Sequence, residues 1–354
     1  MLKQAQAELL NWNGTGISVM EMSHRGKPFV SITEQAEADM RELLKIPDNF
    51  KVFWFQGGAS MQFSAMCYNL LKEGETANYV TTGSWSEAAI KEAKKYCNPN
   101  EVTNNKKHKY ATVDDPSTWN VDPTAKFFHY CKNETIQGLE FHEFPYHVVP
   151  ENQLLISDMS SDFCSKPIDW EKHAMVYAGA QKNVGPSGVC ITIIREDLIG
   201  EGNMRPDTPM LCDWHTYDKA MNTFQNTPTC WSIYMAGLNL KYMRERGMEA
   251  IQAEAVHKSG IFYDYMENSN GFYLNPVDAK YRSCMNIPFR VQKNGKPNEE
   301  LEKKFLGEAT AAGCIDLKGH RSVGGLRASI YNAMPEEGVK ALMDFMTKFK
   351  NENN

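Results

Sequence analysis

Three features that would place the chain in a special class are absent from its 354 residues. No apolar stretch approaches the length needed to span a membrane, and the amino end, MLKQAQAELLNW, is amphipathic rather than signal-like. The nine cysteines have no paired spacing and no C-x-x-C motif, which argues against a disulfide framework and against a zinc site. We therefore expect free thiols in a reducing compartment, a cytoplasmic location and no metal.

An excess of basic residues is also absent. The formal net charge is −6, so neither nucleic acid nor an anionic membrane is expected as the main partner. The chain does contain enough apolar sequence, 42% of its residues, to bury a sizeable core. Its length fits a large domain together with a smaller one.

Polar residues follow two short apolar runs in the middle of the chain. Residues 154–156 are apolar and are followed by Asp158, and residues 174–178 are apolar and lead to Gly179 and Lys182. Both runs read as buried strands. Because open α/β sheets keep their ligand crevice at the carboxyl ends of the strands, the carboxylate and the amine are expected to face one crevice.

A carboxylate and a lysine in one crevice are what pyridoxal phosphate chemistry requires. The lysine amine forms a Schiff base with the cofactor aldehyde, and the carboxylate keeps the pyridine nitrogen protonated so that the ring can accept electrons. Spacing alone is explained more simply by two ordinary strands that end in a surface Asp and a surface Lys.

The amino-acid sequence of these segments is more specific than the spacing of their polar residues. SDMSSDF and AGAQKNVGPSG closely resemble the cofactor-binding segment of the phosphoserine aminotransferases, a family of class-V, fold-type I pyridoxal phosphate enzymes. The resemblance runs from Met1 to the carboxyl end. It implies that Lys182 is the Schiff-base residue, that Asp158 serves the ring nitrogen, and that Gln181 is among the cofactor-binding residues.

The resemblance also implies an α/β fold. A large domain, residues 1–246, would contain a mainly parallel seven-stranded sheet flanked by helices, and residues 247–354 would form a smaller α/β domain. The resemblance allows the N-terminal residues to contribute to the small domain. The sequence after residue 247 fits, with strands expected at 272–275, 284–291, 313–317 and 326–331 and helices at 298–312 and 335–349. We expect residues 189–194 to form an antiparallel strand, and residues 98–120 to form surface helix and loop.

A glycine turn after the strand expected at residues 52–55 is a candidate phosphate site. QGGAS precedes an amphipathic helix, whose free N–H groups and positive dipole end attract an anion. The matching family residues are Ala59 and Ser60. Some family members carry a basic residue in place of Ser60, so we assign Ser60 to the cofactor only.

Two further cofactor contacts follow from the resemblance. Two capping boxes, Ser31-x-x-Glu34 and Ser84-x-x-Glu87, predict helix starts, and the second places Trp85 in a first helical turn at the crevice edge. The resemblance implies that the Trp85 indole stacks on the pyridine ring. CKNETIQG resembles the family segment whose threonine lies beside the ring oxygen, which here is Thr135.

A third helix start is expected at Thr227-Pro228, with Thr as the N-cap and Pro in the first helical position. Plain capping explains this pattern. In the family, the residues that match Asn226 and Thr227 reach across a twofold interface to the partner's cofactor phosphate. The resemblance therefore implies a homodimer with composite active sites.

Cationic residues are expected to hold the substrate. Arg327 interrupts the apolar strand LRASIY, where an unpaired cation is costly to bury, so it needs an anion, and a substrate α-carboxylate is the natural one. EMSHRGKPF resembles the family's substrate loop, which assigns His24 and Arg25 to the distal acidic group. His320 and Arg321 resemble a pair with the same task in the partner's site. Exposed polar loops are the simpler explanation for both pairs.

One departure concerns the amino end. Family members carry a motif of the form F-x-x-G-P-A-x-L-P before the helix that matches residues 1–12, and this sequence lacks it. The segment normally adds a small-domain strand and helps to hold glutamate. Substrate affinity and domain closure are the properties that its absence would affect.

The function that the resemblance implies is amino transfer from L-glutamate to 3-phosphohydroxypyruvate, which gives O-phospho-L-serine and 2-oxoglutarate in serine biosynthesis. A different transaminase or a desulfurase is the closest alternative, but no cysteine stands in an evident reactive loop and the cationic cluster favours a phosphorylated substrate. A nucleotide-binding oxidoreductase would need a G-x-G-x-x-G turn, which QGGAS does not provide. A non-catalytic scaffold would be expected to have lost Lys182 or Asp158.

Overall fold

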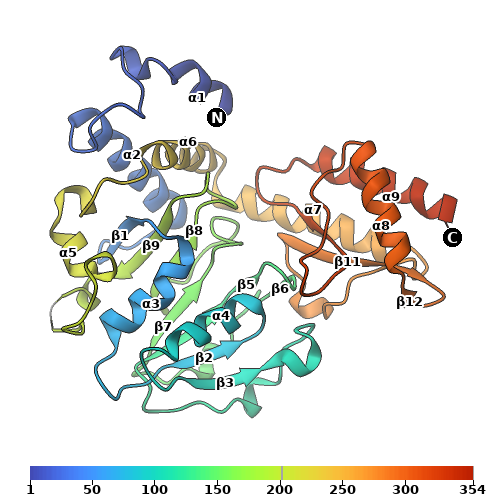
Figure 1. Cartoon of the computed structure of the whole chain (residues 1–354), viewed down its shortest axis with the longest axis horizontal. Helices are drawn as coiled ribbons and strands as arrows, with labels where there is room; N and C mark the ends of the chain where they lie inside the picture. The colour runs from blue at the N-terminus through green and yellow to red at the C-terminus, as the bar shows by residue number, and fades with distance from the viewer. Residues whose placement is uncertain (201, 354) are drawn as a thin grey trace.

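The computed structural model describes residues 1–200 and 202–353. Figure 1 shows a larger part built on a broad sheet and a smaller part that contains the carboxyl end. The large sheet has seven strands in the order β1-β9-β8-β7-β4-β2-β3. Their bounds are Phe50–Phe55 (β1), Asn78–Thr81 (β2), Asn100–Asn104 (β3), Phe127–Cys131 (β4), Leu154–Asp158 (β7), His173–Gly179 (β8) and Cys190–Arg195 (β9).

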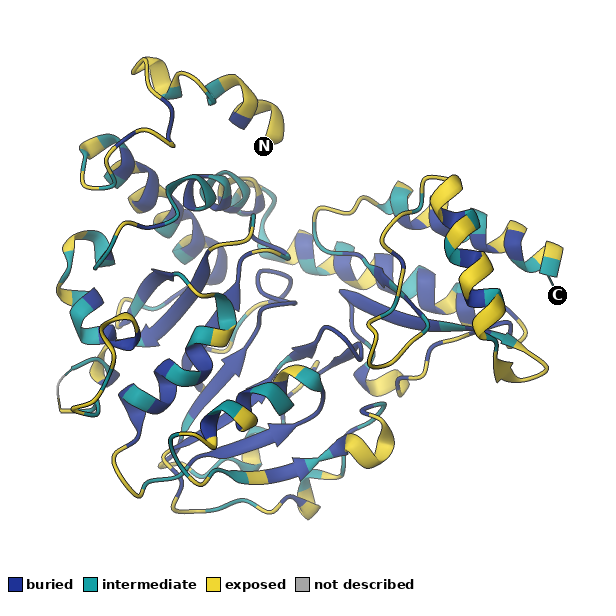
Figure 2. Cartoon of the chain, in the orientation of Figure 1, coloured by how far each residue is buried: buried dark blue, intermediate teal, exposed yellow. Residues whose placement is uncertain are grey.

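Parallel pairing dominates this sheet. Strands β8, β7, β4, β2 and β3 are parallel neighbours, whereas β9 is antiparallel to both β1 and β8. The predicted fold class and the antiparallel strand after the lysine turn are therefore confirmed. The central strands are buried along their whole length, as Figure 2 shows in dark blue, which explains their continuous apolar runs.

Helices cover both faces of the large sheet because its strands alternate between two apolar faces. In β1, Val52 and Trp54 pack with α2 (Lys27–Leu44) and α6 (Cys230–Arg246). Phe53 and Phe55 belong to the core on the opposite face, with α3 (Gly58–Leu70) and α4 (Ser84–Ala93). Each buried Phe or Val side chain contributes about 1.5–3 kcal/mol by leaving water. The remaining helices are α1 (Leu2–Glu8), α5 (Trp214–Lys219), α7 (Met248–Glu267), α8 (Glu299–Ala311) and α9 (Glu336–Asn353).

The smaller part has its own sheet and core. Strand β11 (Asn286–Lys293) pairs with β10 (Tyr273–Leu274), β12 (Lys296–Pro297) and β13 (Leu326–Ser329), and helices α7, α8 and α9 pack on it. Helix α7 belongs to both parts, since Ile251 lies in the core of α2 and α6 whereas Phe262 lies in the small core. The proposed boundary at residue 246 falls between α6 and α7.

A two-stranded hairpin joins the two parts. Its strands are β5 (Asn133–Glu134) and β6 (Leu139–Glu140), and its turn carries Gly138 at φ +71°. The Gly138 carbonyl accepts a hydrogen bond from the Ser283 N–H at 3.0 Å. A β-carbon on Gly138 would lie 2.3 Å from Cδ of Pro288 in β11, so the hairpin can pack this closely only with glycine there.

Several local predictions are wrong. Residues 313–317 form no strand, and an isolated bridge between Lys318 and Leu326 lies beside them. The region 98–120 contains the edge strand β3. Its side chains are mostly polar, so it has no apolar run that would predict a strand. Helix α6 begins at Cys230 with Thr229 as its N-cap, two residues after the predicted start.

The two predicted capping boxes are also wrong. Helix α2 begins at Lys27, so Ser31 lies inside the helix and its hydroxyl donates to the Pro28 carbonyl. Helix α4 has Gly83 as its N-cap and Ser84 in the first turn. Among residues 1–200 and 202–353, no helix combines the length and apolarity needed to cross a membrane.

We predict that Gly138→Ala is strongly destabilising. The left-handed backbone alone costs about 1–2 kcal/mol for alanine, and the overlap with Pro288 adds about 1–3 kcal/mol. Gly271→Ala is the matched control, because Gly271 also has positive φ but has open space around it. Urea unfolding should show a clearly larger loss for Gly138→Ala, and equal losses would contradict the predicted overlap.

Two buried histidines should make the fold sensitive to acid. Burial lowers the pKa of His129 to about 3, and burial lowers that of His173 to about 4. Since the unfolded-state pKa is about 6.5, stability is fully present above pH 6.5 and falls as the pH drops toward these values. Each histidine contributes a slope of about 1.4 kcal/mol per pH unit.

His129→Gln should remove one such slope from urea unfolding measured between pH 6.5 and pH 4. Wild type measured over the same pH range is the reference for this slope. An unchanged slope in His129→Gln would show that His129 is not held neutral in the folded protein.

Candidate active site

A cavity of about 130 Å³ lies at the carboxyl ends of β7 and β8, next to the first turns of α3 and α4. It brings together seven of the residues predicted for the cofactor. The lining residues are Gly58, Ala59, Ser60, Trp85, Cys131, Asn133, Thr135, Asp158, Ser160, Ser161, Gln181 and Lys182.

Lys182 lies in the turn after β8 and points into this cavity. Its Nζ donates to the Thr135 hydroxyl at 2.8 Å and lies 5.6 Å from the centre of the Trp85 ring. Burial lowers the pKa of Lys182, and the negative charges of Asp158 and Glu134 oppose that shift. The amine is therefore closer to its neutral, nucleophilic form than that of a surface lysine.

Asp158 ends strand β7 and is buried. Its Oδ1 accepts from the Ser160 N–H at 2.9 Å and from the Ser160 hydroxyl at 2.6 Å. The same hydroxyl accepts from the N–H of Gly179 at the end of β8, at 3.1 Å. Burial raises the pKa of Asp158, opposed by the Ser160 bonds and by Lys182. A cation placed beside this carboxylate would stabilise its ionised form.

The start of α3 fits a phosphate. Gly57 and Gly58 have φ values of +83° and +64°, and the helix has no side-chain cap on its first N–H groups. Ala59 and Ser60 follow in the first turn and line the cavity. The free N–H groups and the positive dipole end favour an anion here.

The chemistry of these donors fits pyridoxal phosphate. The cavity offers a lysine amine for the aldehyde, a carboxylate for the ring nitrogen, an indole for the ring face and a helix start for the phosphate. These features match Lys182, Asp158, Trp85 and Ser60, the residues that the sequence predicts. Each of them lines the same cavity.

Arg327, on β13 of the small sheet, bonds Thr135, one of the residues that line this cavity. Its Nη1 donates to the Thr135 carbonyl at 3.3 Å, while the Thr135 hydroxyl accepts from Lys182. The positive charge of Arg327 also contributes to the lowered pKa of Lys182. A single residue therefore contacts both the predicted cofactor lysine and the predicted carboxylate-binding arginine.

The remaining predicted residues lie elsewhere. Thr227 and His24 line a second cavity of about 400 Å³. Asn226 and Thr227 are held by Gln56, whose Nε2 donates to the Thr227 carbonyl at 2.7 Å and to Asn226 Oδ1 at 3.5 Å. Arg25 is exposed in the loop before α2.

His320 and Arg321 lie in an exposed loop before β13, outside both cavities. The His320 ring contacts Ser322, with 2.8 Å between Nδ1 and the hydroxyl. The single chain thus does not gather the four predicted cations for the distal acidic group. Whether they share one site stays a prediction.

Sequence reasoning missed the side chains that hold the site together. Glu134 and Gln137, on the hairpin and its turn, bind the start of α4, and Ser160 joins Asp158 to Gly179. These residues lie in the segments NETIQG and SDMSSDF, next to the predicted Thr135 and Asp158, and this proximity could have indicated them. Nothing in the sequence indicates which distant helix Glu134 contacts.

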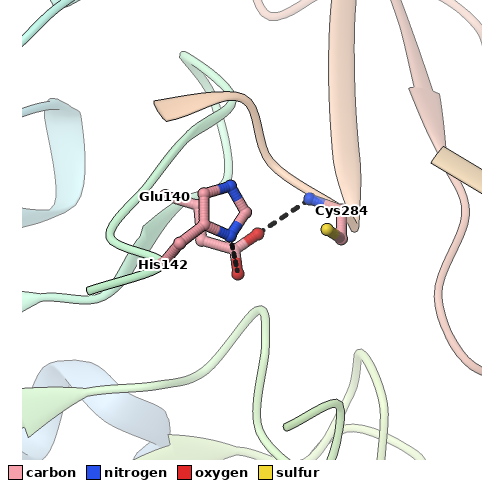
Figure 3. A group of neighbouring side chains, drawn as sticks. All are labelled: Glu140, His142 and Cys284. Atoms are coloured by element: carbon pink, nitrogen blue, oxygen red, sulfur yellow. Dashed lines mark hydrogen bonds and ion pairs between the residues drawn. The ribbon is translucent and has the colours of Figure 1, made fainter. Parts of the chain in front are cut away.

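One side-chain group has the composition of a metal site. Glu140, His142 and Cys284 offer ligand atoms within 4.8 Å of one another. Figure 3 shows these three side chains together; Glu140 lies on β6, His142 follows that strand, and Cys284 lies just before β11. Lys166 lies among them, however. Its Nζ bonds the buried Glu140 carboxylate and lies 2.8 Å from His142 Nδ1. The ammonium group already neutralises the carboxylate, so we assign the cluster to holding β6 against Cys284.

Comparison with known proteins agrees with this geometry. The family model for class-V aminotransferases matches residues 1–342. Phosphoserine aminotransferase 1, chloroplastic, of Arabidopsis thaliana is 48% identical over 351 residues, with 99% of this chain and 79% of the relative covered.

Two solved structures are similar over nearly the whole chain. The phosphoserine aminotransferase of Bacillus circulans subsp. alkalophilus has a TM-score of 0.94 at 44% identity and covers 100% of this chain and 95% of its own. The pyridoxal phosphate-bound phosphoserine aminotransferase of Trichomonas vaginalis has a TM-score of 0.90 at 37% identity and covers 98% and 95%.

The ligand-free protein should show an unusually acidic Lys182. Acylation by a reagent that reacts only with neutral amines, followed by peptide mass spectrometry over a pH series, should give a Lys182 midpoint below the ordinary lysine value of about 10.4. Asp158→Asn should lower it further, because the Asp158 charge raises the pKa of Lys182. A midpoint at the ordinary value, or an upward shift in the variant, would contradict this electrostatic description.

Proposed function

The chain belongs to the class-V aminotransferase family, and we propose that it transfers the amino group of L-glutamate to 3-phosphohydroxypyruvate. The products are O-phospho-L-serine and 2-oxoglutarate, and the reaction serves serine biosynthesis. The observation that carries the proposal is the cavity that holds Lys182 and Asp158, bordered by Arg327, in a chain whose full-length relatives bear the name of this enzyme.

Pyridoxal phosphate is the cofactor, and when bound it supplies the aldehyde that takes up the amino group and a ring that accepts electron density. Lys182 holds the cofactor in the resting enzyme, and its amine then moves a proton at the substrate Cα. Asp158 serves the ring nitrogen in a site with little water, where its charge acts strongly. Ala59, Ser60, Trp85, Thr135 and Gln181 complete the cofactor contacts within the chain.

Both substrates of the two half-reactions carry an α-carboxylate and a second anion. We assign the α-carboxylate to Arg327, whose planar guanidinium matches a carboxylate in a bidentate way. The distal anion is assigned to His24, Arg25, His320 and Arg321. One set of cations can therefore serve glutamate and the phosphorylated keto acid in turn.

A homodimer is part of the proposal. The second cavity contains Thr227 and His24 but not Lys182, which fits a role for these residues in the partner's site. Exposed apolar side chains lie on the segments that lead to it, among them Met20, Met210, Leu211 and Met221. Apolar exposure of this kind is typical of an interface with another subunit.

A reducing compartment such as the cytoplasm is the proposed location. All nine cysteines are free thiols, and six of them are buried. This usage fits a compartment in which disulfides are not maintained.

The proposed function predicts a specific spectral cycle. The purified enzyme loaded with pyridoxal phosphate should show the visible band of the bound cofactor, lose it on addition of L-glutamate, and regain it with 3-phosphohydroxypyruvate. Lys182→Ala should lower the turnover number by at least roughly 10²-fold, since it removes the proton-transferring amine. Arg327→Lys keeps the charge but loses the planar fork, and it should raise KM for both substrates.

Different outcomes distinguish the alternatives. A band that survives glutamate would keep the cofactor and overturn the amino donor. Recovery with pyruvate or oxaloacetate but not with 3-phosphohydroxypyruvate would place the enzyme among other transaminases. Absence of any band after addition of the cofactor would overturn the enzyme assignment.

A further inference from the structure

The first turn of α4 is held by side chains from a hairpin about fifty residues further along the chain. A helix start leaves its first N–H groups without partners inside the helix. Here the Ser84 N–H donates to Gln137 Oε1 at 3.1 Å, the Trp85 N–H to Glu134 Oε2 at 2.9 Å, and the Ser86 N–H to Glu134 Oε1 at 2.9 Å. The hairpin thus supplies the cap that the local sequence does not.

Glu134 is the central member of this cap. Its side chain is fully buried, and its Oε1 also accepts from the Ser86 hydroxyl at 2.6 Å. The carboxylate lies directly against the backbone of Gly83, where an added β-carbon would lie 2.4 Å from Glu134 Cδ. A negative charge at this position also complements the positive end of the α4 dipole.

The cap matters because of what the turn carries. Trp85 is 37% exposed, and its backbone N–H is bonded to Glu134. The ring nevertheless lies 5.6 Å from Lys182 Nζ, at the edge of the cavity. Glu134 does not line that cavity and is separated from it by the residues that do.

We propose that Glu134 is a positioning residue for the reaction, which fixes the Trp85 indole against the cofactor ring by anchoring the first turn of α4. The inference rests on the proposed function in one respect, namely that Trp85 stacks on the cofactor. Glu134 touches neither the cofactor nor the substrate. Its charge also raises the pKa of Lys182, and a variant that lacks the Trp85 indole separates that effect from positioning. The adjacent Thr135 contacts Lys182 and Arg327, so one short segment sets the ring face, the lysine and the carboxylate-binding arginine.

A double-mutant cycle tests this assignment. The dissociation constant of pyridoxal phosphate is measured on the full-length protein for wild type, Glu134→Gln, Trp85→Leu and the double variant. Loss of a well-placed aromatic contact weakens binding by roughly 3–10-fold. Both single variants should fall in this range, and the double variant should bind no more weakly than the weaker single variant, because both remove the same contact.

Other results overturn the assignment in distinguishable ways. If Trp85→Leu weakens binding but Glu134→Gln does not, the positioning role is wrong while the stacking role stands. If the two effects multiply, Glu134 acts on the cofactor by a route other than Trp85. If Trp85→Leu has no effect, the stacking that the proposed function assumes is itself wrong.

Controls separate positioning from folding. Glu87→Gln removes a half-buried acidic side chain, paired with Lys106 at 2.8 Å, from the same helical turn. It should leave the dissociation constant unchanged and the melting temperature nearly so, because such an ion pair contributes little. If Glu134→Gln fails to fold, Ser86→Ala replaces it in the cycle. This variant keeps the carboxylate and removes the Ser86 hydroxyl, which bonds Glu134 and the N–H groups of Thr82 and Gly83. With kcat expressed per bound cofactor, Glu134→Gln should lower kcat and leave KM for glutamate nearly unchanged. A loss of folded protein would instead lower the number of cofactor sites per chain and leave their dissociation constant and their kcat as in wild type.

Discussion

The candidate site depends on the cost of removing an ammonium group and a carboxylate from water in one small cavity. Burial shifts the pKa of Lys182 down and that of Asp158 up, so each group is held closer to its neutral form. The surrounding bonds limit this cost. Ser160 satisfies Asp158 and Thr135 accepts from Lys182. A cofactor with an aldehyde, a basic ring nitrogen and a phosphate supplies the partners that such a cavity lacks.

The hairpin of β5 and β6 connects this cavity to the small sheet. On one side it holds the start of α4 through Glu134 and accepts the Lys182 amine through Thr135. On the other side Asn133 bonds Asn286 at 3.0 Å, and Glu140 accepts from the Cys284 N–H at 2.7 Å. Because the hairpin packs closely against both parts, we expect a shift of the small sheet to move the cavity residues of the hairpin with it. Arg327 and Lys182, which we propose to bind the substrate and the cofactor, are thus linked through this hairpin.

Features that depend on neighbouring residues could be predicted from the sequence, whereas features that depend on distant residues could not. Buried strands such as β7 and β8 have continuous apolar runs, and their polar ends led to Asp158 and Lys182, which the family resemblance made specific. Edge strand β3 was missed because its partly exposed residues are polar. The cap of α4 was misassigned because Glu134, about fifty residues away, supplies it. Contacts of this kind are set by the tertiary fold and leave no short-range pattern.

The four cations assigned to the distal anion raise a further constraint. Arg25, His320 and Arg321 lie on exposed loops, and surface charges bind an anion weakly because water and salt screen them. A further positive charge on the same surface would add little affinity for the anion, because water and salt would screen it too. Enclosure by a second surface would exclude water and strengthen each interaction. The second cavity at His24 and Thr227 belongs to the surface assigned to the homodimer interface. Under the proposed function, the second anion of the substrate is therefore better served by a partner subunit than by another cation.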